Sequence, residues 1–152
     1  MFKIVSGSDF LYGKDNTFTC TLYCQTENGI FPDCQWIDFA KHVFSWWTEE
    51  IVRASRLKKT QFTLRFEDGP FWIDCFKDEG SVHMDFKTEK FSVDGFAELC
   101  ELQEDIPFSE IATELMNAIH YLSSALFGEG HTKDAQETED VATRIRNAIK
   151  SI

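Results

Sequence analysis

Residues 61–87 read QFTLRFEDGPFWIDCFKDEGSVHMDFK, and this stretch decides the fold class. Three runs in it alternate strictly between apolar and polar side chains, which is typical of strands that are buried on one face only. Two turn signals separate the runs. The runs are 61–67, 71–77 and 81–87, and the turns are Asp68-Gly69-Pro70 and Asp78-Glu79-Gly80. The stretch therefore predicts an antiparallel meander of three strands.

Further strands are predicted outside this meander. Thr17 to Cys24 alternates in the same way, and Phe2 to Val5 is expected to form a short additional strand. Residues 91–103 contain a turn signal at Asp94-Gly95, and the run after it fits either a strand or a short helix; we favour a strand. The polar face of the predicted sheet would carry Thr19, Thr21, Tyr23, Thr63, Arg65, Trp72, Asp74, Phe76, His83 and Asp85.

Three segments have the spacing of amphipathic helices. In residues 36–55, a rotation of ~100° per residue places Trp47 near the middle of a wide apolar stripe and Trp46 at its edge. Residues 108–127 and 138–151 are the other two predicted helices, and residues 128–138 are expected to form a mobile loop between them.

This order of elements favours an α+β fold. We expect a single domain over residues 1–152, with one antiparallel meander sheet. The long helix of residues 36–55 and the two C-terminal helices would pack on one face of that sheet. The pattern does not determine the strand order.

The net charge of −11 comes entirely from the second part of the chain. Residues 1–60 carry seven Lys/Arg and seven Asp/Glu, whereas residues 61–152 carry eight and 19. No Lys or Arg occurs from 91 to 132. Such a distribution disfavours direct nucleic-acid binding and attracts basic proteins. In the alternative interpretation, the acidity only keeps the protein in solution.

The sequence contains no signal for export or for a membrane span. The apolar run in MFKIVSGSDF is too short for a signal peptide, and no window approaches ~18 apolar residues. The five cysteines are an odd number without a CxxC pair, so we expect reduced thiols and a cytoplasmic location.

Motifs for catalysis, metals and cofactors are likewise missing from the sequence. The four histidines fall on four separate predicted elements, and no HxxxH pair or GxSxG occurs. Gly128-Glu129-Gly130 follows a helix and lacks the order of a phosphate-binding loop. We therefore predict no enzyme active site, no metal and no cofactor.

Large aromatic residues and carboxylates share the predicted polar sheet face, a combination typical of protein-binding surfaces. We expect a protein partner, and the candidate partner-binding residues are Trp46, Glu49, Trp72, Asp74, Phe76, Asp85, Glu98, Glu101, Glu104 and Asp105. In the alternative interpretation, residues 128–152 cover the sheet face and make it part of the core.

Residues 31–47 read FP-x3-W-x-DF-x3-V-x2-WW, and F-x-DGPF follows at 66–71. Over roughly residues 30–75 this pattern resembles small bacterial immunity proteins that are encoded beside contact-dependent or polymorphic toxins. The resemblance implies a cytosolic, non-enzymatic inhibitor that binds its toxin stoichiometrically, and it transfers no site residue. The acidic second half of the chain would suit a basic toxin domain, for example a nuclease.

Two other functions stay open at this point. The chain would also suit a small-ligand-binding protein or an enzyme with a pocket between sheet and helices. A regulatory or structural component of an oligomer is the other alternative. The identity of the partner and the oligomeric state do not follow from the sequence.

Overall fold

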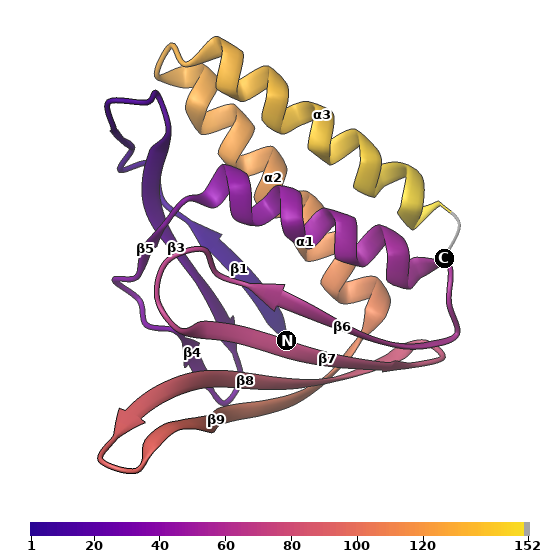
Figure 1. Ribbon diagram of the computed structural model, residues 1–152. Coiled ribbons are helices and arrows are strands. Elements are labelled where there is room, and N and C mark those ends of the chain that lie inside the picture. Colours follow the sequence, from indigo (N-terminus) through magenta and orange to yellow (C-terminus); the bar gives the residue numbers. More distant parts are fainter. Residues whose placement is uncertain (151–152) are drawn as a thin grey trace.

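The computed structural model describes residues 1–150 and confirms the α+β class (Figure 1). Three helices lie together on one side of the molecule, above strands that form two antiparallel sheets. The strands are β1 (Phe2–Ser6), β2 (Leu11–Tyr12), β3 (Phe18–Thr26), β4 (Gly29–Phe31), β5 (Ile37–Asp38), β6 (Lys59–Arg65), β7 (Phe71–Asp78), β8 (Ser81–Ser92) and β9 (Gly95–Pro107). The helices are α1 (Ala40–Ser55), α2 (Phe108–Gly128) and α3 (Thr132–Ile149).

The predicted meander forms a four-stranded sheet in the order β6-β7-β8-β9. Its register places Thr63 opposite Asp74, Asp74 opposite Asp85, and Asp85 opposite Gln103. The side chains predicted to point inward from these three strands are buried, except that Phe71 is partly buried. The fourth strand, β9, confirms the prediction of a strand after Asp94-Gly95.

The expectation of a single sheet was wrong, because β3 belongs to a second sheet. β3 pairs with β1, β2, β4 and β5, all antiparallel, and with no strand of the meander. Thr19, Thr21 and Tyr23 therefore lie on this second sheet and not on the face that carries Trp72. Alternation shows which side of a strand is buried, but the partner strand depends on distant parts of the chain.

Two predicted helix starts were also wrong. Helix α1 begins at Ala40 instead of Trp36, because Ile37 and Asp38 pair with β3. Helix α3 begins at Thr132 instead of Thr138, so residues 132–138 are helical and only 129–131 separate α2 from α3. The predicted end of α3 at Ser151 lies outside the described residues.

The helices form two layers. α1 packs on β6 and β3, and α2 packs on β1, whereas α3 packs mainly on α2 and α1 (Figure 1). α3 is thus an outer layer over the other helices instead of a cover for the sheet. Within residues 1–150, no helix combines the length and hydrophobicity that a membrane crossing requires.

The aromatic residues of the FP…WW and F-x-DGPF patterns meet where the two sheets join. The Phe31 ring lies edge-on to Phe66 and Phe71, at centroid distances of 6.0 and 5.6 Å. Trp36 lies 4.8 Å from Phe71, and Trp47 lies 5.3 Å from Phe66. These residues have a structural function here, because they pack two segments of the chain that are distant in sequence.

The buried carboxylate of Asp38 holds the same corner by hydrogen bonds. Its oxygens accept from Trp36 Nε1 at 3.0 Å, from Phe39 N at 2.7 Å and from Asp68 N at 3.1 Å. Burial nevertheless raises the pKa of Asp38. Beside it, Gly69 adopts a left-handed φ of +71°, and a Cβ there would lie 2.6 Å from the Trp36 ring. Only glycine combines that backbone conformation with the close approach of the indole.

Candidate protein-binding surface

The side of the four-stranded sheet that points away from the helices is the candidate site, and we call it the outer face. No α3 residue packs over it in the part of the chain that the structure describes, since α3 lies on α2 and α1. Its side chains are intermediate or exposed, and the ring of Phe76 is 40% accessible. The outer face consists of Gln61, Thr63, Arg65, Trp72, Asp74, Phe76, His83, Asp85, Lys87, Cys100, Gln103 and Asp105.

One polar network crosses the outer face through Asp74. Lys87 Nζ lies 3.0 Å from Asp74 Oδ2 and 3.6 Å from a carboxylate oxygen of Glu98 on β9. Thr63 Oγ1 donates to Asp74 Oδ1 at 3.2 Å. Asp74 thus holds Lys87 in place. Because its side chain is only 15% exposed, it offers little surface to a partner.

A second network centres on His83. Its Nδ1 lies 2.8 Å from Asp105 Oδ1, and its Nε2 lies 2.9 Å from Asp85 Oδ1, which also accepts from Gln103 Nε2 at 2.8 Å. The hydrogen bond to Asp105 raises the pKa of His83 against the opposing effect of partial burial, and Asp85 adds to the rise. Carboxylates only accept, so the ring satisfies both contacts when it is doubly protonated.

The two predicted α1 residues join the outer face at its other edge. Trp46 is 44% exposed and Trp47 is fully buried, which confirms the assignment from helix rotation. Trp46 and Glu49 line a shallow hollow of about 460 Å³ together with Thr63 and Arg65. Since both strand residues belong to the outer face, the surface continues from β9 to helix α1.

Glu104 does not belong to the outer face. It precedes Asp105 on β9, so strand alternation turns it to the opposite side, where its Oε1 accepts from Asn28 Nδ2 at 2.7 Å. That contact links β9 to the turn between β3 and β4. Glu101 is exposed and lies where the β8–β9 register shifts by one residue.

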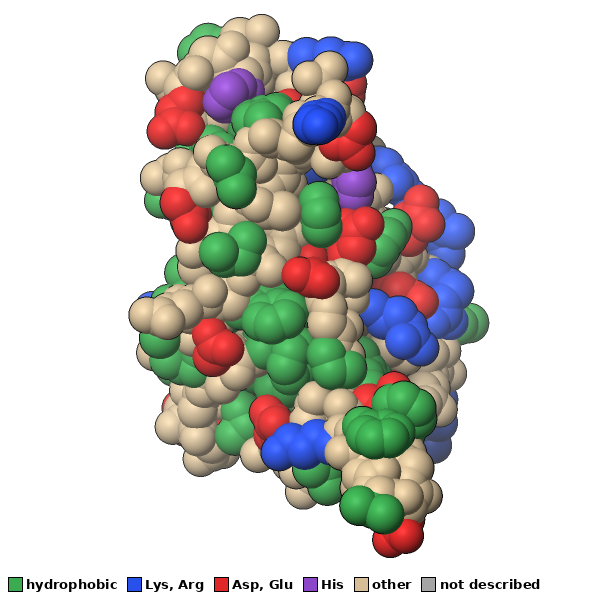
Figure 2. All heavy atoms as spheres, turned by 60° about the vertical axis from the view of Figure 1, so that its left-hand side comes forward, with side chains coloured by type: hydrophobic (Ala, Val, Ile, Leu, Met, Phe, Trp, Pro, Cys, Tyr) green, Lys and Arg blue, Asp and Glu red, His purple; other side chains and the backbone are tan. Residues whose placement is uncertain are grey.

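The structure contains a projecting hairpin, residues 88–101, which we call the arm. The sequence predicted its turn at Asp94-Gly95 and its second strand, but not the extension of β8 beyond Lys87. The arm carries four exposed apolar side chains, Phe91, Val93, Phe96 and Leu99, and Figure 2 shows hydrophobic side chains on the surface at the lower end of the molecule, where the arm lies. The alternation that identified the other strands is lost in the arm, because both of its faces are exposed. The available signal was the four large apolar residues within a window that lacks Lys and Arg.

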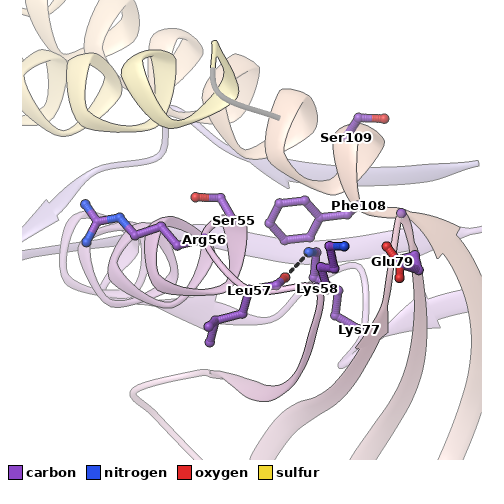
Figure 3. Close-up of a pocket in the computed structure, with 9 residues that line it drawn as sticks. Ser55, Arg56, Leu57, Lys58, Lys77, Glu79, Phe108 and Ser109 are labelled. Atoms are coloured by element: carbon purple, nitrogen blue, oxygen red, sulfur yellow. Dashed lines mark hydrogen bonds between the residues drawn. The ribbon is translucent and has the colours of Figure 1, made fainter.

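A small basic hollow of about 320 Å³ lies beside the start of α2 (Figure 3). Arg56, Lys58 and Lys77 contribute its positive charge. Lys77 Nζ donates to the carbonyl of Leu57 and lies 4.9 Å above the Phe108 ring. Lys77 thus joins the end of α1 to the start of α2, and its contacts are explained by that structural function.

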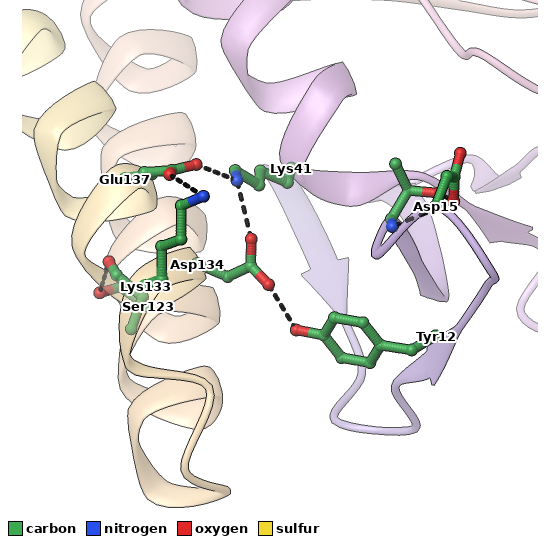
Figure 4. Close-up of polar contacts among 9 residues, drawn as sticks. Tyr12, Asp15, Lys41, Ser123, Lys133, Asp134 and Glu137 are labelled. Carbon is green, nitrogen blue, oxygen red and sulfur yellow. Dashed lines mark hydrogen bonds and ion pairs between the residues drawn. The ribbon is translucent and has the colours of Figure 1, made fainter.

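A polar cluster near the start of α3 likewise has a structural function (Figure 4). Asp134 accepts from Tyr12 Oη at 2.6 Å and from Lys41 Nζ at 2.8 Å, and Lys41 also pairs with Glu137. Burial opposes ionisation of Asp134, but the bonds from Lys41 and Tyr12 outweigh it and lower the pKa. The cluster joins α1, α3 and β2.

The three buried thiols are poor nucleophiles, whereas Cys34 and Cys100 are exposed. Burial raises the pKa of Cys20 to about 12, and it also raises the pKa values of Cys24 and Cys75. A thiol with a raised pKa is a weak nucleophile at neutral pH. Across residues 1–150, no three His, Cys, Asp or Glu side chains are grouped to hold a metal ion.

None of the protein-family models, curated proteins or solved structures compared with the chain matches it. The evidence for function therefore comes from this surface. Its accessible aromatic and acidic groups include Trp46, Glu49, Phe76, Glu98 and Asp105, with side-chain exposure of 66% for Glu49, 64% for Glu98 and 76% for Asp105. Gln61, Arg65, Cys100 and Gln103 are exposed as well. Exposed rings among carboxylates suit binding of a cationic protein surface.

Proposed function

We propose that this protein is a cytoplasmic, non-enzymatic inhibitor of the immunity type, which binds and neutralises a basic toxin domain. The observation that carries the proposal is the outer face, where exposed aromatic rings and carboxylates form one surface from α1 to β9. Trp46 and Phe76 would be its anchors, since binding energy concentrates in aromatic residues at the centre of an interface.

The charges divide into two groups with different functions in this proposal. Asp74 and Asp85 hold Lys87 and His83 and so fix the shape of the outer face. Asp105, Glu98 and Glu49 also lie near a cation, namely His83, Lys87 and Arg144, respectively, but they are exposed and would contact the partner. Their carboxylates would steer a basic domain toward the surface and raise the association rate at low salt.

The resemblance to immunity proteins agrees with this proposal but does not locate the interface. Its aromatic residues largely form the buried corner between the sheets, and Trp46 is the exposed aromatic member of the pattern. A basic nuclease domain is the partner that the acidic second half of the chain favours, because the carboxylates would compete with phosphate for the same cationic surface.

The test is purification of the protein together with the C-terminal domain of a toxin encoded beside its gene. We expect a one-to-one complex by light scattering, loss of toxin activity, and association that slows as salt rises from about 50 to 200 mM. A Phe76→Ala, Asp105→Asn variant should bind about tenfold or more weakly.

A matched control removes one ring and one carboxylate at the α2–α3 end of the molecule. Phe127→Ala with Glu129→Gln alters two exposed side chains there, and we expect unchanged affinity. A tight complex that the outer-face variant leaves intact would refute this interface. Absence of any complex or protection would refute the inhibitor function.

A further inference from the structure

The arm contains an unpaired sheet edge. β9 pairs with β8 on one side, and no other strand of residues 1–150 pairs with it. Farther along β9, the Asn28 side chain bonds to Glu104, and Gly29 lies against the Leu102 side chain. Residues 95–101 lie beyond these contacts, and such an edge presents free N–H and C=O groups that can pair with an added strand.

Apolar side chains stand beside this edge. Phe91 and Phe96 lie opposite each other with ring centroids 5.3 Å apart, and they are 77% and 72% exposed. Val93 lies exposed at the tip, and Leu99 is exposed on the opposite face of the arm. A group of large exposed apolar side chains marks an interaction site, because a second surface is needed to remove it from water.

The charges of the arm select the kind of partner. Glu89 and Glu98 face each other directly across β8 and β9, a like-charge pair that destabilises a sheet. Lys87 Nζ approaches Glu98 to 3.6 Å, whereas no cation among residues 1–150 pairs with Glu89. A Lys or Arg side chain of a bound segment would neutralise this pair.

We infer that the arm binds an extended, basic segment of a partner protein as an additional β-strand along β9. This inference rests on the proposed function and specifies how the inhibitor would hold its target. Backbone pairing would supply affinity, while apolar side chains of the segment would cover the Phe91–Phe96 pair and its cations would lie beside Glu89 and Glu98.

A second copy of the chain is a poor occupant for the same edge. Pairing β9 with itself would bring together Glu98 and Glu101 of two molecules, and β9 itself carries no Lys or Arg to offset them. Like charges facing each other across strands disfavour that pairing. The charge complementarity therefore favours a basic partner.

The experiment is an NMR titration of the full chain with three capped heptapeptides. One alternates Lys and Val, the second alternates Glu and Val, and the third is the Lys/Val peptide with an N-methyl group on every backbone amide, so that neither edge of the strand can donate. We expect saturable shifts in the amides of residues 88–101 with the first peptide, and binding about tenfold or more weaker with the other two. Alternate β9 amides should also gain protection from hydrogen exchange.

Variants locate the binding on the arm. Glu89→Gln with Glu98→Gln should weaken binding of the Lys/Val peptide several-fold. Glu129→Gln with Asp140→Asn changes the net charge equally and should leave the affinity for this peptide unchanged. Circular dichroism checks that both variants fold. Equal binding of the N-methylated peptide, shifts outside the arm, or a dimer held through β9 would each overturn the inference.

The result separates the two proposals. If the protein inhibits the toxin domain but its arm does not bind the Lys/Val peptide, strand addition is refuted and the inhibitor function is not. Peptide binding along β9 without any toxin complex would support strand addition and refute the inhibitor function.

Discussion

The indole Nε1 of Trp47 donates a 2.7 Å hydrogen bond to the carbonyl oxygen of Arg65, which ties the middle of α1 to the end of β6. Trp47 is fully buried, whereas its neighbour Trp46 is 44% exposed on the rim of the outer face. Of these two adjacent tryptophans, Trp47 thus stabilises the fold, and Trp46 contributes to the candidate site.

Alanine substitutions at the two tryptophans should therefore differ sharply. Trp47→Ala removes a large core side chain and the partner of a backbone carbonyl, and we expect a loss of about 3–5 kcal/mol in the free energy of unfolding. Trp46→Ala should cost less than about 1 kcal/mol, as for a surface substitution. Urea unfolding followed by circular dichroism measures both, and similar losses at the two positions would contradict the assignment.

A pair of glycines offers a second matched comparison. Gly69→Ala forces a side chain into the left-handed region and against Trp36, so we expect a loss of about 2–4 kcal/mol. Gly80→Ala meets no atom within 4 Å, and its effect should stay under about 1 kcal/mol. Thermal and urea unfolding give both values. If Gly69→Ala is tolerated, the close approach of the Trp36 ring to Gly69 is not required for stability.

The stability supplied by His83 should depend on pH. Its pKa is raised in the folded state, mainly by Asp105, so its contribution is complete below about pH 6.5 and is lost as the pH rises through the folded pKa. NMR titration of the ring should show the raised pKa. In His83→Gln, the loss of stability relative to the unmodified protein should be larger at pH 6 than at pH 8.5; a loss independent of pH would exclude this origin.

The stability supplied by the Lys41–Asp134 contact should depend on pH in the opposite direction, with the loss at acid pH. The pKa of Asp134 is lowered in the folded state, so its contribution is present above the ordinary value of 3.8 and is lost as the pH falls through the folded pKa. Lys41→Met should flatten this dependence, because it removes a donor to Asp134. Unfolding measured from pH 6 down to pH 2.5 tests this, with Lys133→Met as an exposed control; identical curves for the protein and Lys41→Met would refute it.

Local patterns predicted the elements whose structure depends on nearby residues. Helix rotation separated Trp46 from Trp47, and alternation identified β6, β7 and β8. Both patterns arise because a single element has one buried side. Helix α1 was predicted too long because Ile37 and Asp38 pair with β3, a contact that no helical spacing reveals. The start of α3 was missed because its buried side is made by Ala135 and Thr138, small or polar residues that give a weak apolar signal.

The candidate site was predictable to the extent that strand faces were. Trp72, Asp74, Phe76 and Asp85 share the outer face because each lies two residues from the next or opposite another across the register. Glu104 was included in the candidate site because of its charge. Strand alternation alone would have placed its side chain on the other face of β9 from that of Asp105. The turn and the second strand of the arm were predicted from Asp94-Gly95, but the extension of β8 to Ser92 was not, since an element exposed on both faces has no buried side to impose a period.

The bond between Asn28 and Glu104 has a mechanical consequence. β9 is fixed there to the turn that joins β3 and β4, and β8 is paired with β7 as far as Thr88. The hairpin beyond these contacts is anchored at one end only, like a cantilever. A force applied to its tip would be transmitted at that fulcrum to the second sheet, so a pull on one hairpin would load both sheets of the molecule.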